Sequence, residues 1–104
     1  SPFVVLPSGE VSNQIRVKIV NRSDEARDYH VELVGGEGLE LVAPQNPIPL
    51  NAGATETATF FVTSNASRFG SGVIAIELRV HDDADFDQTV PYKLLGPQSA
   101  EDTK

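Results

Sequence analysis

Apolar and polar residues alternate with a period of two along most of the chain, which is typical of β-strands that bury one face. Some segments show this alternation clearly and others are short apolar runs, and together they predict seven strands: Phe3–Leu6, Ile15–Ile19, Tyr29–Leu33, Leu39–Val42, Thr55–Thr63, Ile74–Val80 and Val90–Leu94. No window has a convincing 3.6-residue period, so no helix is predicted.

Prolines refine the arrangement of these strands. Pro44, Pro47 and Pro49 lie between the fourth and fifth apolar segments, and each lacks the N–H that a central strand would need. We therefore expect residues 43–50 to cross from one sheet to another. Pro91 lies inside the last segment, which predicts that this strand forms the edge of a sheet.

Seven short strands with turn residues between them and a proline-rich crossover are typical of an all-β, antiparallel sandwich of the immunoglobulin or fibronectin-III type. We predict this sandwich over residues 1–96, followed by a flexible C-terminal tail at 97–104. The sequence has no cysteine and no tryptophan, so Ile, Val, Leu, Phe and Tyr must fill the core. The alternation directs Val90, Tyr92 and Leu94 inward.

The formal net charge of −7 changes the range of expected partners. Binding to nucleic acid or to anionic lipid requires clustered Lys and Arg side chains on the protein. The basic residues of this chain are scattered, so we expect it to bind neither. No apolar run reaches the ~20 residues that span a bilayer, so we expect no direct membrane insertion by this segment. The chain has no methionine and begins with Ser1, which suggests a part of a larger protein.

Candidate chemistry is sparse. Without cysteine there is no thiol nucleophile or thiolate metal site, and His30 and His81 both point away from the core by parity. They could bind a metal ion only if the fold brought them together. No acid, base and nucleophile converge, so we predict no enzyme, no catalytic residue and no cofactor.

The acidic turn from His81 to Asp87 is a weak candidate metal site. Asp83, Asp85 and Asp87 stand at alternate positions, as at the start of a calcium loop, but the glycine and glutamate of such a loop are missing. The alternative is a solvated hairpin tip, in which aspartate favours the turn and its charge protects an exposed edge.

Two further features have alternative interpretations. Val20 and Phe61 fall on the outward side of strands that should share a sheet, so they could form a small docking patch, or Phe61 could lie at a bulge or under a loop. Asn21-Arg22-Ser23 and Asn65-Ala66-Ser67 match the glycosylation pattern, but we interpret both as turns.

The order of these segments resembles a known family. Phe3–Leu6, then Ser8–Val11, then Asn13–Asn21 resemble the opening of the C-terminal immunoglobulin-like domain of the FixG (CcoG) family of cytochrome c oxidase accessory proteins. Val31–Gly35, the crossover from Pro49 to Gly53, Phe60–Val62 and the closing Leu95–Pro97 follow in the expected order.

The resemblance implies a parent that is an integral membrane iron–sulfur protein, assists maturation of the cbb-type cytochrome c oxidase and handles copper. This domain would then be a non-catalytic, periplasmic scaffold without a cofactor of its own. It would dock a protein partner, such as an oxidase subunit or copper chaperone, or the membrane core of its own parent.

Two other functions stay open from the residues. One is an extracellular carbohydrate-binding or adhesion module of a larger secreted protein, although few aromatic side chains are expected at the surface. The other is a weak metal-binding module, with calcium at Asp83, Asp85 and Asp87 or copper near His81.

Overall fold

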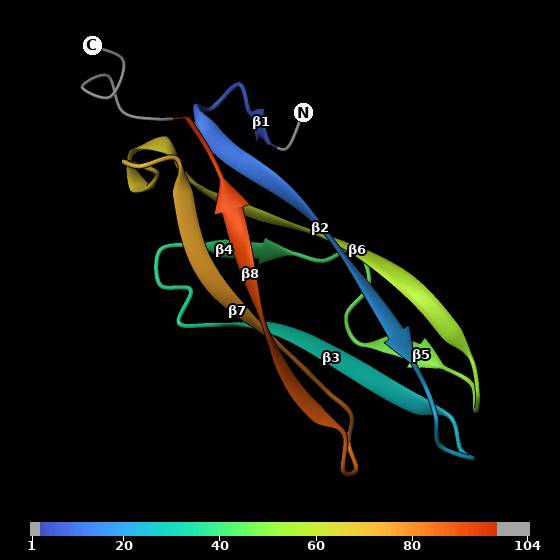
Figure 1. Ribbon diagram of the computed structural model, residues 1–104. Coiled ribbons are helices and arrows are strands. Elements are labelled where there is room, and N and C mark those ends of the chain that lie inside the picture. The colour runs from blue at the N-terminus through green and yellow to red at the C-terminus, as the bar shows by residue number, and fades with distance from the viewer. Residues whose placement is uncertain (1–2, 98–104) are drawn as a thin grey trace.

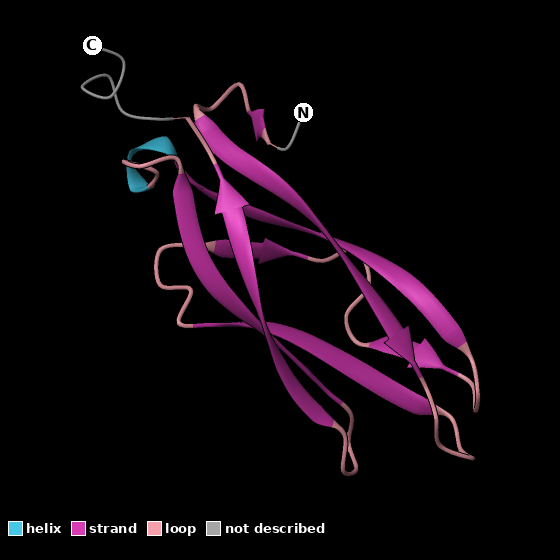
Figure 2. Ribbon diagram, viewed as in Figure 1, coloured by secondary structure: helices cyan, strands magenta, loops and turns pink. Residues whose placement is uncertain are grey.

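The computed structural model describes residues 3–97, which fold into two facing antiparallel sheets (Figures 1 and 2). The first sheet has the order β1 (Val4–Val5), β2 (Glu10–Val20), β6 (Thr55–Asn65) and β4 (Glu40–Val42). The second has the order β5 (Ile48–Leu50), β3 (Arg27–Val34), β7 (Val73–His81) and β8 (Asp87–Leu95). A short 3₁₀ helix, η1 (Ala66–Arg68), follows β6. The all-β, two-sheet prediction is confirmed.

The strand count differs from the predicted seven, because the described residues contain eight strands. The additional strand is β5, inside the proline-rich crossover. The chain does cross from the first sheet to the second between β4 and β5. β5 then pairs with β3 on one side only, with Pro49 opposite Asp28, and such an edge position tolerates a proline.

The core forms between the sheets, from side chains that alternate along β2, β3, β6 and β7. Ile15, Phe60, Val62 and Leu78 are completely buried, and Val31 nearly so. Phe69, just after η1, is also buried and closes one end of the core. No helix in the described part of the chain is long and apolar enough to cross a membrane.

The last strand confirms one expectation and corrects another. β8 lies at the edge of its sheet, as Pro91 predicts, and Leu94 is fully buried. Val90 and Tyr92, expected in the core, are 40% and 37% exposed. They stand opposite the buried residues Leu78 and Ile76 of β7, so their side of the sheet is correct, but the packing of residues 3–97 leaves them partly exposed. Most of the predicted tail lies outside the described residues.

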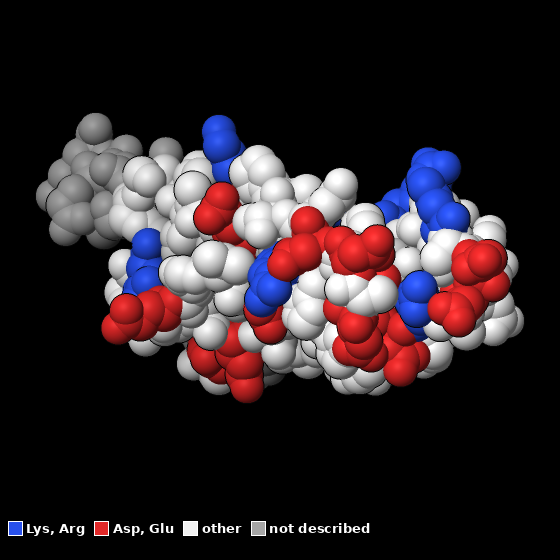
Figure 3. Space-filling view, turned by 90° about the horizontal axis from the view of Figure 1, so that it is seen from below, with Lys and Arg blue, Asp and Glu red and all other residues white. Residues whose placement is uncertain are grey.

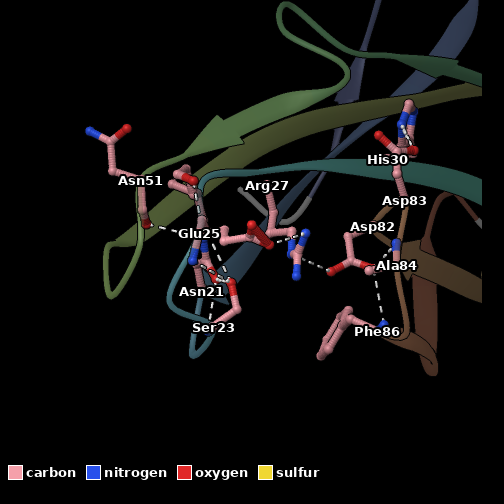
Figure 4. Close-up of polar contacts among 11 residues, drawn as sticks. Asn21, Ser23, Glu25, Arg27, His30, Asn51, Asp82, Asp83, Ala84 and Phe86 are labelled. Carbon is pink, nitrogen blue, oxygen red and sulfur yellow. Dashed lines mark hydrogen bonds and ion pairs between the residues drawn. The ribbon is translucent and has the colours of Figure 1, made fainter.

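Two turns at one end of the sandwich are held together by the buried side chain of Asn21. Its amide nitrogen lies 2.9 Å from the carbonyl oxygen of Glu25 and 3.1 Å from those of Leu50 and Asn51. Its side-chain oxygen accepts hydrogen bonds from the backbone and hydroxyl of Ser23 (Figure 4). The β2–β3 turn is thereby fixed against the turn between β5 and β6.

Candidate functional site

A groove of about 600 Å³ lies between the second half of β2 and the first half of β8. Val17 and Val20 contribute to one wall, and Gln88 and Val90 to the other. Tyr29 and Val80 lie between them, and the β7–β8 hairpin contributes Phe86. The groove thus exposes apolar side chains that a closed sandwich would cover.

Outside the groove, a side-chain clamp joins β2 of the first sheet to β8 of the second. The Nδ2 group of Asn13 on β2 donates to the carbonyl oxygen of Leu95 on β8 at 2.9 Å, and Asn13 Oδ1 accepts from the Leu95 N–H at 2.8 Å. This pair reproduces the two bonds of a strand ladder. Within the groove, Val17 faces inward but is only half-buried, because the second sheet does not cover it fully.

The hairpin beside the groove is organised by Asp82. Its Oδ1 accepts hydrogen bonds from the backbone N–H groups of Ala84 at 2.9 Å and Phe86 at 3.0 Å (Figure 4). Burial by itself raises the pKa of Asp82, but these hydrogen bonds and the charge of Arg27 bring the pKa below its ordinary value. The Asp82 carboxylate is therefore occupied in fixing the turn.

Tyr29 and Phe86 form the aromatic part of the groove. Their rings meet edge to face with centroids 5.6 Å apart, a favoured geometry for aromatic pairs. Burial and the nearby Asp82 carboxylate raise the pKa of Tyr29 above its ordinary value. The phenol therefore stays neutral at physiological pH. Tyr29 itself is buried, so Phe86 is the ring of the pair that is partly exposed at the groove.

Charge is distributed unevenly around this region. Acidic side chains are spread along the face shown in Figure 3, with isolated basic groups among them, as the net charge of −7 leads one to expect. Asp85 contributes to the groove beside the hairpin, whereas Lys18 and Arg22 contribute on the β2 side. Acidic groups therefore lie at the hairpin side of the groove, whereas Arg22 and the outward-facing Lys18 lie at its β2 side.

The fold brings the two histidines together on the outer face of the second sheet. His30 and His81 are direct cross-strand partners, and their rings stack with centroids 5.1 Å apart. His30 Nε2 lies 3.3 Å from Asp83 Oδ1, and His81 Nε2 lies 3.8 Å from Glu32 Oε2. The sequence left this possibility open, because it depends on the pairing of β3 with β7.

The acidic candidates of the hairpin are not gathered around one point. Asp83 lies against His30, Asp85 contributes to the groove, and Asp87 forms two hydrogen bonds with Arg79, at 3.0 and 2.7 Å. The hydrogen bond and charge of Arg79 lower the pKa of Asp87. Within residues 3–97, no group of three or more His, Cys, Asp or Glu side chains is arranged to hold a metal ion.

Val20 and Phe61 lie in the same sheet but far apart. Val20 pairs with Thr55, whereas Phe61 pairs with Gln14. The six-residue separation along β2 corresponds to about 20 Å. Val20 contributes to the groove, and Phe61 lies beside Val42 of β4, so the structure does not join them in one patch.

Of the two glycosylation-like triplets, Asn21-Arg22-Ser23 lies in the turn after β2, as interpreted from the sequence, whereas Asn65-Ala66-Ser67 lies at the end of β6 and in η1. Asn21 is completely buried, whereas Asn65 is exposed and caps η1 by accepting a hydrogen bond from the Ser67 N–H. Both asparagine side chains therefore have a local structural role.

Comparison with known proteins identifies the fold and the family of this chain. A search of curated proteins finds no match. A solved structure, "Crystal structure of FixG-related protein from Vibrio parahaemolyticus", is 17% identical with a TM-score of 0.75, over 86% of this chain and 82% of that one, and supports the fold. The family model described as "IG-like fold at C-terminal of FixG, putative oxidoreductase" matches residues 1–97. The chain therefore belongs to the FixG C-terminal immunoglobulin-like domain family.

Proposed function

We propose that this chain is a non-catalytic interaction domain of a membrane-bound iron–sulfur protein that assists assembly of the cbb-type cytochrome oxidase. The domain lies in the periplasm and uses its groove to hold a protein partner. Family membership supports the type of parent protein. The domain itself takes part through binding and positioning, whereas the parent's membrane core carries the redox chemistry.

The observation that carries the binding role is the open groove between β2 and β8. A sandwich normally buries side chains that face the opposite sheet, yet Val90 and Tyr92 stay exposed on that side of β8. Exposed apolar surface in a concave site is favourable to a ligand, because its burial releases water. The clamp between Asn13 and Leu95 keeps the two sheets together beside the groove.

Deletion of residues 1–97 from the parent protein tests this function. We expect the amount of assembled, active cbb-type oxidase in membranes to fall, while the iron–sulfur absorption spectrum of the purified parent is retained. Loss of the iron–sulfur spectrum, with oxidase loss in proportion, would contradict a separate interaction role. Unchanged oxidase assembly would contradict the proposed function altogether.

A matched variant separates the groove from the fold. Val90→Asp places a carboxylate on the exposed apolar wall and should reduce oxidase assembly with little effect on folding, because the side chain is already 40% exposed. Thr89→Asp, at the exposed neighbouring position of β8, is the control. Fusion of alkaline phosphatase after Lys104 tests the location, since that enzyme is active only in the periplasm.

A further inference from the structure

We propose that the groove accepts an extended segment of the partner protein, which adds as a new strand to the free edge of β2. One face of this segment carries apolar side chains and the other carries acidic side chains. The inference deepens the interaction role proposed above and rests on it. It follows from the direction of the backbone groups of β2, the apolar groove beside them and the charge of the outer face.

The backbone of β2 offers an unpaired edge next to the groove. β1 pairs only with Val11 and Ser12, and among the described residues no other strand lies on that side of β2. The Leu6 N–H donates to the carbonyl oxygen of Glu10, so even-numbered residues of β2 point their backbone groups to this side. The residues that present N–H and C=O groups beyond β1 are therefore Gln14, Arg16, Lys18 and Val20.

The opposite edge, β8, is less suited to accept a strand. The Leu95 N–H donates to Asn13 Oδ1, so odd-numbered residues of β8 point their backbone groups away from β7. Pro91 is one of these residues and has no N–H, which interrupts the edge in its middle. An added strand would lose a hydrogen bond there, whereas the free part of β2 contains no proline.

The groove determines the inner face of the added strand. A segment paired with β2 would direct every second side chain towards Val17 and Val90. Tyr29 and Phe86 would lie beneath the end of the segment that is next to the β7–β8 hairpin. Alternate side chains of an added strand gain specificity from pockets of this kind. Apolar residues at these positions would cover the half-buried Val17 and the exposed Val90.

The outer face of β2 determines the other side chains of the segment. Arg16 and Lys18 project there, and their partners across the sheet, Thr59 and Thr57, are uncharged. Neither basic residue forms an ion pair within the described part of the chain. Acidic residues on the added strand would lie next to them and pair favourably.

The same charges argue against a second copy of this chain as the occupant. Antiparallel pairing of two β2 edges in this region would set Arg16 and Lys18 of one copy against those of the other. Like charges directly opposite each other destabilise a strand pair, and cationic side chains on an edge are a known protection against self-pairing.

The test uses a capped ten-residue peptide in which glutamate alternates with valine, titrated into the ¹⁵N-labelled chain. We expect slower hydrogen exchange of the backbone amides at the unpaired edge of β2, which belong to Gln14, Arg16, Lys18 and Val20. The backbone amides of Thr89 and Lys93 on β8 should show no change. A peptide with lysine in place of glutamate should bind at least tenfold more weakly. Protection at β8 instead of β2 would overturn the assignment.

Charge reversal provides a variant that leaves the strand intact. Arg16→Glu combined with Lys18→Glu should weaken binding of the glutamate–valine peptide about tenfold and strengthen binding of the lysine–valine peptide. Lys93→Glu on the exposed edge of β8 is the control and should change either affinity less than twofold. An unchanged preference in the double variant would refute the charge argument.

Two outcomes separate this inference from the function on which it rests. If neither peptide changes any amide shift at millimolar concentration, strand addition is wrong, yet the deletion experiment can still support the interaction role. If the chain alone shows concentration-dependent shifts along β2, the occupant is a second copy and the proposal fails. If oxidase assembly survives deletion while the peptide binds β2, the site stands and the proposed function does not.

Discussion

Replacement of Asn21 by alanine should destabilise the fold by about 4 kcal/mol. The asparagine is completely buried, and its side chain contacts three carbonyl oxygens, one backbone N–H and one hydroxyl. An amide side chain has two N–H donors and two acceptor sites, so about four bonds act at full strength. Each hydrogen bond contributes about 1 kcal/mol net to stability. Alanine has no polar side-chain atom, so the backbone and hydroxyl partners of Asn21 would stay buried without a hydrogen-bond partner.

The effect should be visible as a shift of the urea midpoint monitored by far-UV circular dichroism, with an unchanged slope m. Circular dichroism suits this chain because it has no tryptophan. A loss of about 4 kcal/mol is a large part of the 5–15 kcal/mol that is typical of a single domain. The free energy of unfolding should therefore fall by about a quarter or more.

Asn65→Ala is the matched control for this prediction. Asn65 is exposed and its side-chain oxygen accepts one hydrogen bond from Ser67 N at 3.1 Å. Its loss should cost about 0.5–1 kcal/mol. Equal destabilisation by the two variants, or a loss below about 1.5 kcal/mol for Asn21→Ala, would show that water replaces the buried bonds and would refute the reasoning.

Three other outcomes are expected. Asn13→Ala removes both bonds to Leu95 and should cost about 2 kcal/mol in urea unfolding; a loss below 0.5 kcal/mol would show that the clamp is not needed. The pKa values of Asp82 and Asp87 are lowered in the folded state, so both carboxylates stabilise the fold at pH values above the ordinary carboxyl pKa of about 3.9. This stability is lost as pH falls through the lower folded pKa values. The urea concentration at the midpoint should therefore decrease once the pH is below about 4. Asp82→Asn should flatten this drop, and an identical pH profile would contradict it. Titration of Ca²⁺ should leave the amide shifts of residues 81–87 unchanged below millimolar metal, whereas micromolar shifts would identify a cation site.

The sequence alone was sufficient for the fold class and for the faces of most strands. Alternation has a period of two in any strand, so the inward positions of Ile15, Val31 and Leu78 follow from neighbouring residues only. The edge position of β8 follows from Pro91, because a missing N–H excludes a central strand wherever it occurs. The same local argument gave no sign of β5, since a proline is compatible with an edge strand.

Other features depend on contacts between distant residues, and only the tertiary structure decided them. Alternation assigns Val90 and Tyr92 to the core side of β8, but their exposure depends on whether the opposite sheet extends over them. The stacking of His30 on His81 and the distance between Val20 and Phe61 depend on strand register, which local patterns do not fix.

The candidate site belongs to this second group. Arg16 and Lys18 are visible in the sequence as polar positions of a strand, but their meaning depends on the short length of β1, which leaves the edge of β2 unpaired. The Asn13 clamp joins residues 82 positions apart. A groove forms where two sheets separate, and the packing of the whole sandwich sets that separation. The alternation of apolar and polar residues that forms each strand, by contrast, depends only on residues close together in the sequence.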